Sequence, residues 1–279
     1  RSVSRGLGDV YKRQSEESLD GGKNEMAAHG GFDHIDVAFM VHGSTLTQLE
    51  TPSLALIEMD VEFHGKTAHA GIAPYAGRSA VDAVTMLQTG LGLMRNHLKD
   101  SSRVSNIVLA GGTAVNSVPD FAKFKVEIRH SSMAYLESVE QWTREIAQAA
   151  AMATQTQVQI TPVAHIYNTT INDAMGALLM ECAEKFACDG IAPPRKDCGS
   201  TDFGAVTHRL PSCCLRVKTI ETDDPPHTDA WVKTGKEARA HQGIYDGAVC
   251  CALAAFRLVT DEAAWQDVYQ CFLAHQKEN

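Results

Sequence analysis

The sequence predicts a mixed α/β protein in which a small split β-α-β-β-α-β domain is inserted into a larger α/β domain. Residues 54–162 show strand and helix patterns in the order strand, helix, strand, strand, helix, strand, which is the order of a ferredoxin-like domain. On both sides of this segment, continuous apolar runs alternate with helical patterns, which is typical of a parallel α/β layer. We therefore expect the larger domain to be formed by two separate pieces of the chain and to be only partly present.

The strands of the inserted domain are predicted from apolar residues at every second position. In the first of them, Ile57 and Met59 alternate with Glu58 and Asp60. An antiparallel sheet of this kind packs one face on helices and leaves the other exposed or paired. The four predicted strands are 54–64, 104–110, 121–129 and 157–162.

Two helices are predicted between these strands from apolar residues at helical spacing. The first follows Gly77 and the second lies between the third and fourth strands. Their apolar positions are Val81, Val84, Leu87, Leu91 and Met94 in the first helix, and Leu136, Val139, Ile146, Ala147 and Ala150 in the second.

The larger domain is predicted from the flanking segments. Upstream lie a short helix near 23–28 and an apolar strand at 35–41 that leads to His42. Downstream we expect helices at 175–186 and about 236–258, separated by a loop containing Pro193-Pro194 and a buried strand at 213–217. The expected domain boundaries are 1–14, 15–53, 54–166 and 167–279.

Residues 1–14 are predicted to be a non-native segment. Ser4–Gln14 reads SRGLGDVYKRQ, without apolar periodicity or a helix cap, and DVYKRQ is what the end of a transposase-type sequencing adapter encodes. We leave this segment out of the fold prediction. The interpretation makes the chain an N-terminally truncated fragment. The alternative is a disordered basic arm.

Composition narrows the possible functions. The 279 residues carry a formal net charge of −9, which argues against a nucleic-acid or anionic-membrane partner. No apolar run in the sequence reaches the length that a bilayer span needs. The eight cysteines lie between Cys182 and Cys271 without a CxxC pair. Buried thiols in a reducing cytoplasm are therefore favoured over a cysteine-dependent redox protein or a structural zinc site.

Several residues have the chemistry of a metal-dependent hydrolase. His69 follows a strand and Gly65 on a Gly-rich turn, where a histidine can reach a ligand. In Glu16-Glu17, one carboxylate can bind a cation while the other handles a proton. His42 ends a strand and His227 lies in the loop DDPPHTD, both of which are common positions for zinc ligands. The ordinary alternatives are a solvated glutamate pair and surface or core histidines.

An ordered set of motifs resembles peptidase family M-20. EESLDGGKNEMAAHGGFDHIDVAFMVHG is similar to the stretch after the family's central strand, and FHGKTAHAGIAPYAGRSAVDA, GGTAVNSVPD, VEIR and GSTDFG follow in the family's order. PPHTDAWVKTGKEARAHQG resembles the p-aminobenzoyl-glutamate hydrolase B-subunit and Xaa-Arg dipeptidase-like branches. The resemblance implies a partial zinc-peptidase-like α/β catalytic domain, with the inserted domain as a lid and dimerisation domain.

The resemblance also implies roles for the catalytic and metal-binding residues. Glu16 would be the general base that takes a proton from the attacking water and later protonates the leaving amine. Glu17 and His227 would share one divalent ion, Zn²⁺ or Mn²⁺, and His42 would bind a second. His69 would reach into the site of a partner subunit and donate a hydrogen bond to the oxyanion.

Asn116 and Arg129 are implied to hold the carboxylate of the substrate. Arginine suits this task because its donor fork matches two carboxylate oxygens. The alternative for Arg129 is an exposed strand residue in a ladder of Lys and Glu side chains. The alternative for Asn116 is a turn cap before Pro119.

The implied function is hydrolysis of the amide bond of an N-acyl amino acid or dipeptide by a cytoplasmic homodimer. The family's first ligands, in an HxD or CGHDxH run, do not precede Glu16 in this sequence. Glu17, His42 and His227 supply only part of a two-ion site. We therefore expect this chain by itself to bind metal poorly and not to turn over. The alternative function is a non-catalytic, dimerising ligand-binding protein of the same fold.

Overall fold

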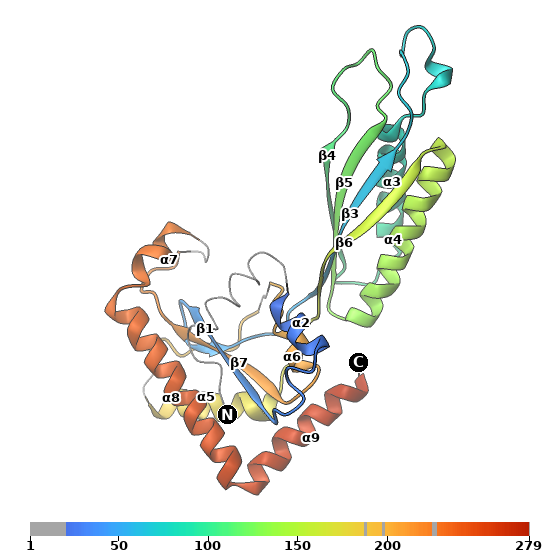
Figure 1. The fold of residues 1–279 in the computed structure, drawn as a ribbon. Coiled ribbons are helices and arrows are strands. Elements are labelled where there is room, and N and C mark those ends of the chain that lie inside the picture. The colour runs from blue at the N-terminus through green and yellow to red at the C-terminus, as the bar shows by residue number, and fades with distance from the viewer. Residues whose placement is uncertain (1–20, 187–188, 197–198, 225–227, 279) are drawn as a thin grey trace. The chain divides into compact units, whose positions relative to one another are not determined.

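The structure, a computed structural model, describes residues 21–186, 189–196, 199–224 and 228–278. The chain forms two compact units, which are described one at a time. The first is built around Leu54–Asn168 together with Ser200–Asp202. The second contains Lys23–Ser53, Thr169–Gly199 and Phe203–Asn279. Both units combine helices with a sheet (Figure 1), and the predicted α/β class is confirmed.

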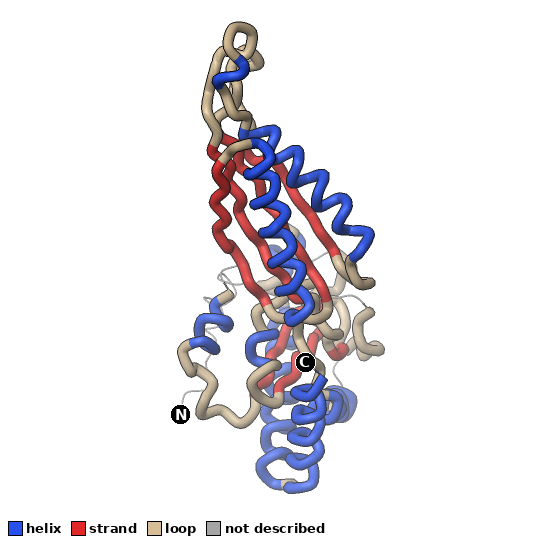
Figure 2. The backbone as a smooth tube through the Cα atoms, turned by 90° about the vertical axis from the view of Figure 1, so that its right-hand side faces the viewer, coloured by secondary structure: helices blue, strands red, loops and turns tan. Residues whose placement is uncertain are grey.

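The first unit contains a four-stranded antiparallel sheet in the order β4-β5-β3-β6. The elements follow one another as strand, helix, strand, strand, helix, strand, as the sequence predicts. Both helices lie against the same face of the sheet (Figure 2). The bounds are β3 Ala55–His64, α3 Ala80–Met94, β4 Arg103–Ala110, β5 Phe121–His130, α4 Met133–Thr154 and β6 Gln157–Ile166.

The core of the first unit lies between the sheet and its two helices. Phe63 on β3 and Phe124 on β5 are fully buried there, and Leu87 on α3 packs into the same cluster. Burying one such large apolar side chain stabilises a fold by about 1.5–3 kcal/mol. Ser79 and Ser132 begin the two helices, and their side chains accept hydrogen bonds from backbone N–H groups of the first turns.

β6 is longer than predicted. The sequence places the end of this strand at Pro162, but the strand continues to Ile166. The register against β3 shifts between Glu58 and Met59, where Pro162 pairs. A proline is tolerated because β6 is an edge strand, where a backbone N–H can point away from the sheet without a partner.

The second unit contains a three-stranded sheet in the order β1-β7-β2, in which β1 and β7 are parallel and β2 is antiparallel. Helices α5 and α8 contact β7, and α9 packs on α5 and α8. The strands are β1 Ala38–Ser44, β2 Gln48–Leu49 and β7 Ser212–Lys218. The helices are α2 Gly22–Ala28, α5 Asp173–Lys185, α6 Gly204–Thr207, α7 Asp229–Thr234, α8 Ala238–Thr260 and α9 Glu262–Glu278.

β1 starts later than predicted. The sequence suggests a strand over 35–41, but β1 begins at Ala38. Residues just before it form tight turns, in which the Asp33 N–H donates to the Gly30 carbonyl and the Ile35 N–H to the Phe32 carbonyl. β1 also ends later than predicted, at Ser44, so His42 lies inside the strand instead of just after it.

Alternate residues of β7 pack on opposite faces of this sheet. Leu215 and Val217 belong to the cluster under α5 and α8. Cys214 packs on the other face with Phe203 and Val206. The same face carries Arg216 beyond Cys214, so apolar packing gives way to charge toward the carboxyl end of the strand.

Among the described residues, α8 is a helix long and apolar enough to cross a membrane by length and composition. Its buried residues recur three or four positions apart and include Gly243, Gly247, Cys250 and Ala254. The helix packs against α5, β7 and β1. A core helix of a globular domain passes the same test, so we draw no membrane inference from α8.

Candidate functional site

The carboxyl end of the parallel pair in the second unit carries charged side chains. His42 on β1 lies directly opposite Arg216 on β7 in the strand register. In open α/β sheets, ligands bind outside the carboxyl ends of the parallel strands. The position of His42 is therefore suitable for a ligand-binding residue.

The ring of His42 is oriented by its Nδ1 atom. This nitrogen lies 2.7 Å from the Gly43 carbonyl oxygen and 3.1 Å from Nη1 of Arg216. With a proton on Nδ1, the ring donates to the Gly43 carbonyl and its lone pair is on Nε2. Histidines that bind metals show this arrangement, in which the other ring N–H donates to a carbonyl or carboxylate. His42 fits a metal ligand through Nε2 in the tautomer whose Nδ1 donates to the Gly43 carbonyl; in the tautomer whose Nδ1 accepts from Arg216, Nε2 carries the proton instead.

A buried ion cluster beside His42 was not predicted. Glu50 is only 6% exposed, and its carboxylate accepts from Nε of Arg216. Nη1 of Arg195 lies 3.6 Å from the other carboxylate oxygen. The sequence signal that could have indicated this cluster is Arg216, a charge inside the apolar strand CCLRV. Its partner Glu50 could not be found by spacing, because it lies far away in the sequence.

Three of the predicted site residues, Glu16, Glu17 and His227, lie outside the described residues. The convergence of Glu17 and His227 with His42 therefore stays a prediction. Within the part of the chain that the structure describes, no group of three or more His, Cys, Asp or Glu side chains is arranged to hold a metal ion.

His69 and Asn116 lie next to each other at one end of the first unit. His69 forms a bridge with Ser117, and the Ala70 N–H donates to the Asn116 carbonyl over 2.9 Å. Nδ1 of His69 accepts from the Gly71 N–H at 3.2 Å, so Nε2 is the ring nitrogen that can carry the proton. The two loops thus hold His69 at an exposed tip of the unit.

Arg129 lies near the opposite end of the same unit. Its Nε and Nη2 donate to the two carboxylate oxygens of Glu127 over 2.7 and 2.9 Å. Its Nη1 donates to Oγ of Ser200 over 3.3 Å, and Ser200 donates to the Leu54 carbonyl. The pairing with Glu127 is also what the alternative of a charged strand ladder predicts, so the substrate-binding role of Arg129 stays a prediction.

One copy of the unit does not bring these predicted residues together. β5 starts at Phe121, just after the loop that contains Asn116, and reaches Arg129 eight positions later. At about 3.4 Å per residue, those eight positions span roughly 27 Å. This is longer than a dipeptide, so Arg129 cannot hold the same small ligand as His69 and Asn116 of its own copy.

Charged side chains cover the sheet face that the helices leave open. Nζ of Lys123 lies 2.8 Å from Asp60 and 2.9 Å from Glu62, and Nζ of Lys125 lies 2.6 Å from Glu58. Hydrogen bonds to Asp60 and Glu62 raise the pKa of Lys123, and those to Glu58 and Asp60 raise the pKa of Lys125. These side chains form a network of ion pairs rather than a pocket.

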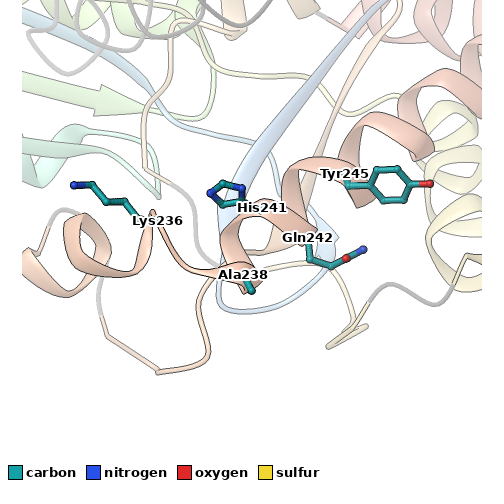
Figure 3. A pocket seen from close by; sticks show the side chains of 5 residues that line it. All are labelled: Lys236, Ala238, His241, Gln242 and Tyr245. Carbon is teal, nitrogen blue, oxygen red and sulfur yellow. The ribbon is translucent and has the colours of Figure 1, made fainter.

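The second unit also has an open depression at the start of α8. It is lined by Lys236, Ala238, His241, Gln242 and Tyr245 (Figure 3). The side chains of Lys236 and Tyr245 point away from each other in this view, so the polar groups do not converge on one ligand. None of the predicted site residues lines it.

Comparison with known proteins identifies the first unit. Residues 55–155 match the M20 family model described as a peptidase dimerisation domain. This unit is an M20 peptidase dimerisation domain. The chain is 28% identical over 266 residues to the Xaa-Arg dipeptidase of Mus musculus, a match that covers 94% of the chain and 62% of that protein.

A second relative and a solved structure agree with this assignment. The B-subunit of the p-aminobenzoyl-glutamate hydrolase of Escherichia coli is 26% identical, with 89% of the chain and 64% of that protein covered. The fold is similar to a Bacillus subtilis protein, YXEP, described as a dinuclear metal-binding peptidase of the M20 family. The TM-score is 0.57 at 15% identity, over 86% of this chain and 63% of that one. The predicted resemblance to family M-20 is confirmed, and the chain spans less than two thirds of the length of these relatives.

Proposed function

We propose that the whole protein is a metal-dependent hydrolase that cleaves the amide bond of an N-acyl amino acid or a dipeptide. The observation that carries the proposal is the similarity to an Xaa-Arg dipeptidase along 94% of the chain. The similarity includes the M20 dimerisation domain and the segments on both sides of it. The names of the relatives, a dipeptidase and an aminobenzoyl-glutamate hydrolase, both describe hydrolysis of an amide bond.

Two divalent ions, Zn²⁺ or Mn²⁺, are proposed as cofactors. Glu17 and His227 would hold one ion, and His42 would hold the other through Nε2. The proposal is supported by the Nδ1 contact of His42 with the Gly43 carbonyl and by the dinuclear description of the YXEP protein. When bound, such ions polarise the scissile carbonyl and activate water for attack.

The remaining roles belong to side chains of the chain itself. Glu16 would accept the proton of the attacking water and return it to the leaving amine. His69 would donate from Nε2 to the oxyanion that forms as water attacks. Asn116 and Arg129 would bind the carboxylate and so fix the orientation of the substrate.

The catalytic unit is proposed to be a homodimer. The roughly 27 Å between the two ends of β5 separates His69 and Asn116 from Arg129 within one copy. A complete site would therefore take His69 and Asn116 from one copy and Arg129 from another. Two apolar side chains near His69, Ile72 and Tyr75, are 76% and 82% exposed, which favours burial of this tip against a second copy.

We propose that the two copies join through the edge of β4. The sheet has two edge strands, β4 and β6. β6 contains Pro162 and a register shift, which protect an edge from pairing with another strand. β4 contains no proline and exposes Ile107 and Leu109. The β4 edge is therefore the better surface for adding the β4 strand of a second copy.

The cytoplasm is proposed as the compartment. The six cysteines in the described residues form no disulfide with one another. Burial raises the pKa of the Cys213 thiol to about 12, which keeps it protonated and unreactive. Cysteines that form no disulfide are typical of a reducing compartment.

The proposed function is tested by hydrolysis and metal content measured together. We would assay the chain, and a longer version that adds the N-terminal part of the mouse relative, on dipeptides and N-acyl amino acids. We expect the longer version to release amino acid, to bind two ions and to lose activity with EDTA. His42→Ala and His69→Ala should each lower its activity at least about a hundredfold. The non-catalytic alternative would be supported instead if the longer version folds and each dimer binds two molecules of a carboxylate compound without hydrolysing them.

A further inference from the structure

We propose that Glu127 is a specificity-determining residue of the Arg129 site and selects ligands with one carboxylate over ligands with two. The inference rests on the proposed role of Arg129 in binding the substrate carboxylate. It adds an expectation about the substrate. The substrate residue whose carboxylate Arg129 binds should have a neutral or basic side chain, not an acidic one.

The first step is the geometry of the guanidinium. Glu127 occupies the Nε and Nη2 edge of Arg129 with both carboxylate oxygens. The Nη1 end faces Oγ of Ser200 over a longer distance, 3.3 Å. An incoming carboxylate would therefore bind at the Nη1 end, where a weak contact to a neutral hydroxyl is replaced by a charge-assisted one. Glu127 stays bound to Nε and Nη2 and thereby keeps the Nη1 end of the guanidinium directed toward the ligand.

The second step is the local charge. Arg103 on β4 lies directly opposite Arg129, and Ser105 lies opposite Glu127. Like charges opposite each other destabilise a sheet unless an anion compensates them. Nη1 of Arg103 donates to the Ser102 carbonyl, a neutral group. Arg103, Arg129 and Glu127 therefore sum to one positive charge, which one carboxylate of a ligand neutralises.

The third step is the cost of a second carboxylate. On the β3 side of Glu127 the sheet offers no further cation, because Glu58, which is paired with Glu127 in the register, binds Lys125 over 2.6 Å. On the β4 side, the charge of Arg103 is already part of the single positive charge that the first carboxylate neutralises. The second carboxylate of an aspartate or glutamate would thus lie near Glu127 without a partner of its own. Like-charge repulsion and the loss of its hydration would weaken binding of such a ligand.

The experiment compares two probes on the intact chain, N-acetyl-L-alaninate with one carboxylate and N-acetyl-L-glutamate with two. Binding is followed by NMR through the Nε–Hε signal of Arg129. We expect the wild type to prefer the alaninate by about fivefold, the size of a partly exposed charge interaction. Glu127→Gln should abolish or reverse this preference, and Glu127→Asp, which keeps the charge, should retain it.

Matched controls separate the possible outcomes. Glu140→Gln removes a carboxylate that binds Arg144 on α4, on the helical side of the same unit, and should leave the preference unchanged. If Arg129→Met abolishes binding but Glu127→Gln leaves the preference intact, the inference is overturned and the carboxylate role of Arg129 stands. If neither probe binds, or Arg129→Met binds both as well as the wild type does, both ideas fail. Circular dichroism confirms that each variant is folded.

Discussion

At the residue scale, Asp60 links the stability of the first unit to pH. Burial raises the pKa of this carboxyl group, but hydrogen bonds from Lys123 and Lys125 outweigh burial, so the pKa lies below its ordinary value of 3.8. A lowered pKa in the folded state means that the carboxylate stabilises the fold above pH 3.8. That contribution disappears as the pH falls through the folded-state value.

We expect Asp60→Asn to lower the free energy of unfolding at pH 7 by about 1 kcal/mol. The difference between variant and wild type should shrink as the pH falls below 4, because the wild-type group becomes protonated there too. Urea unfolding at several pH values between 2 and 7 measures both quantities. A difference that stays constant over this range would show that the ion pairs of Asp60 do not contribute to stability.

Gly65 is a second position where a single added carbon atom is expected to change the stability of the protein. A Cβ atom at this position would lie 2.0 Å from the carbonyl oxygen of Arg78, which is fixed by its hydrogen bond with Lys66. We expect Gly65→Ala to destabilise the protein by about 3 kcal/mol or more, since the clash is with backbone. Thermal unfolding measures the effect.

Gly92 provides the control for this change. It lies inside α3, and a Cβ atom there would meet nothing within 4 Å. Gly92→Ala should raise stability by about 0.5–1 kcal/mol, because alanine loses less backbone entropy in a helix. Equal effects at the two positions would contradict the packing that the structure shows around Gly65.

The candidate site was predictable only where a residue stands out in its local sequence. His42 does so because it precedes Gly43 near the end of an apolar strand. His69 does so because it lies on the turn between Gly65 and Gly71 that follows a strand. Glu50 and its partner Arg216 are joined by folding across 166 sequence positions, which no local pattern shows. Likewise, the pairing of Arg129 with Glu127 depends on side-chain orientation, which spacing leaves open between two alternatives.

At the element scale, the edge strands decide how copies of the first unit can associate. We expect Ile107→Lys on β4 to weaken a homodimer at least about tenfold, because like charges facing each other across an interface cost several kcal/mol. The matched control is Val163→Lys on β6, which is also an exposed apolar edge residue. Sedimentation equilibrium of both variants and the wild type measures the dissociation constants. Dissociation by the β6 change alone would place the interface at the other edge.

Most elements of the first unit follow from the sequence because local pattern and tertiary environment agree there. Period-two alternation gives β3 and β5, one side of which is buried under helices. β6 was predicted too short, since the ability of an edge strand to accept Pro162 depends on the neighbours of the strand. The two residues of β2 are too few to form a pattern. α9 was not predicted, although Asp261 accepts from the Ala263 and Ala264 N–H groups as a helix cap does.

At the scale of the whole molecule, the two sheets differ in whether their strands come from one continuous segment of the chain. The M20 dimerisation domain is continuous in sequence and contains its own core. The sheet of the second unit is built from distant segments, and β1 has β7 as its only strand neighbour among the described residues. The sequence predicts the existence of the second sheet from apolar runs, but its strand order depends on long-range contacts.

Ser53 and Thr169 join the two chain segments that lead into and out of the inserted domain. The Ser53 N–H donates to Oγ1 of Thr169 over 2.6 Å, and the Thr169 N–H donates to Oγ of Ser53 over 2.9 Å. These two hydrogen bonds hold the segments before and after the inserted domain together and involve none of residues 54–168. An engineer could exchange the 54–168 cassette for another module with adjacent termini, or splice it out with a short Gly-Ser turn, while keeping these two hydrogen bonds intact.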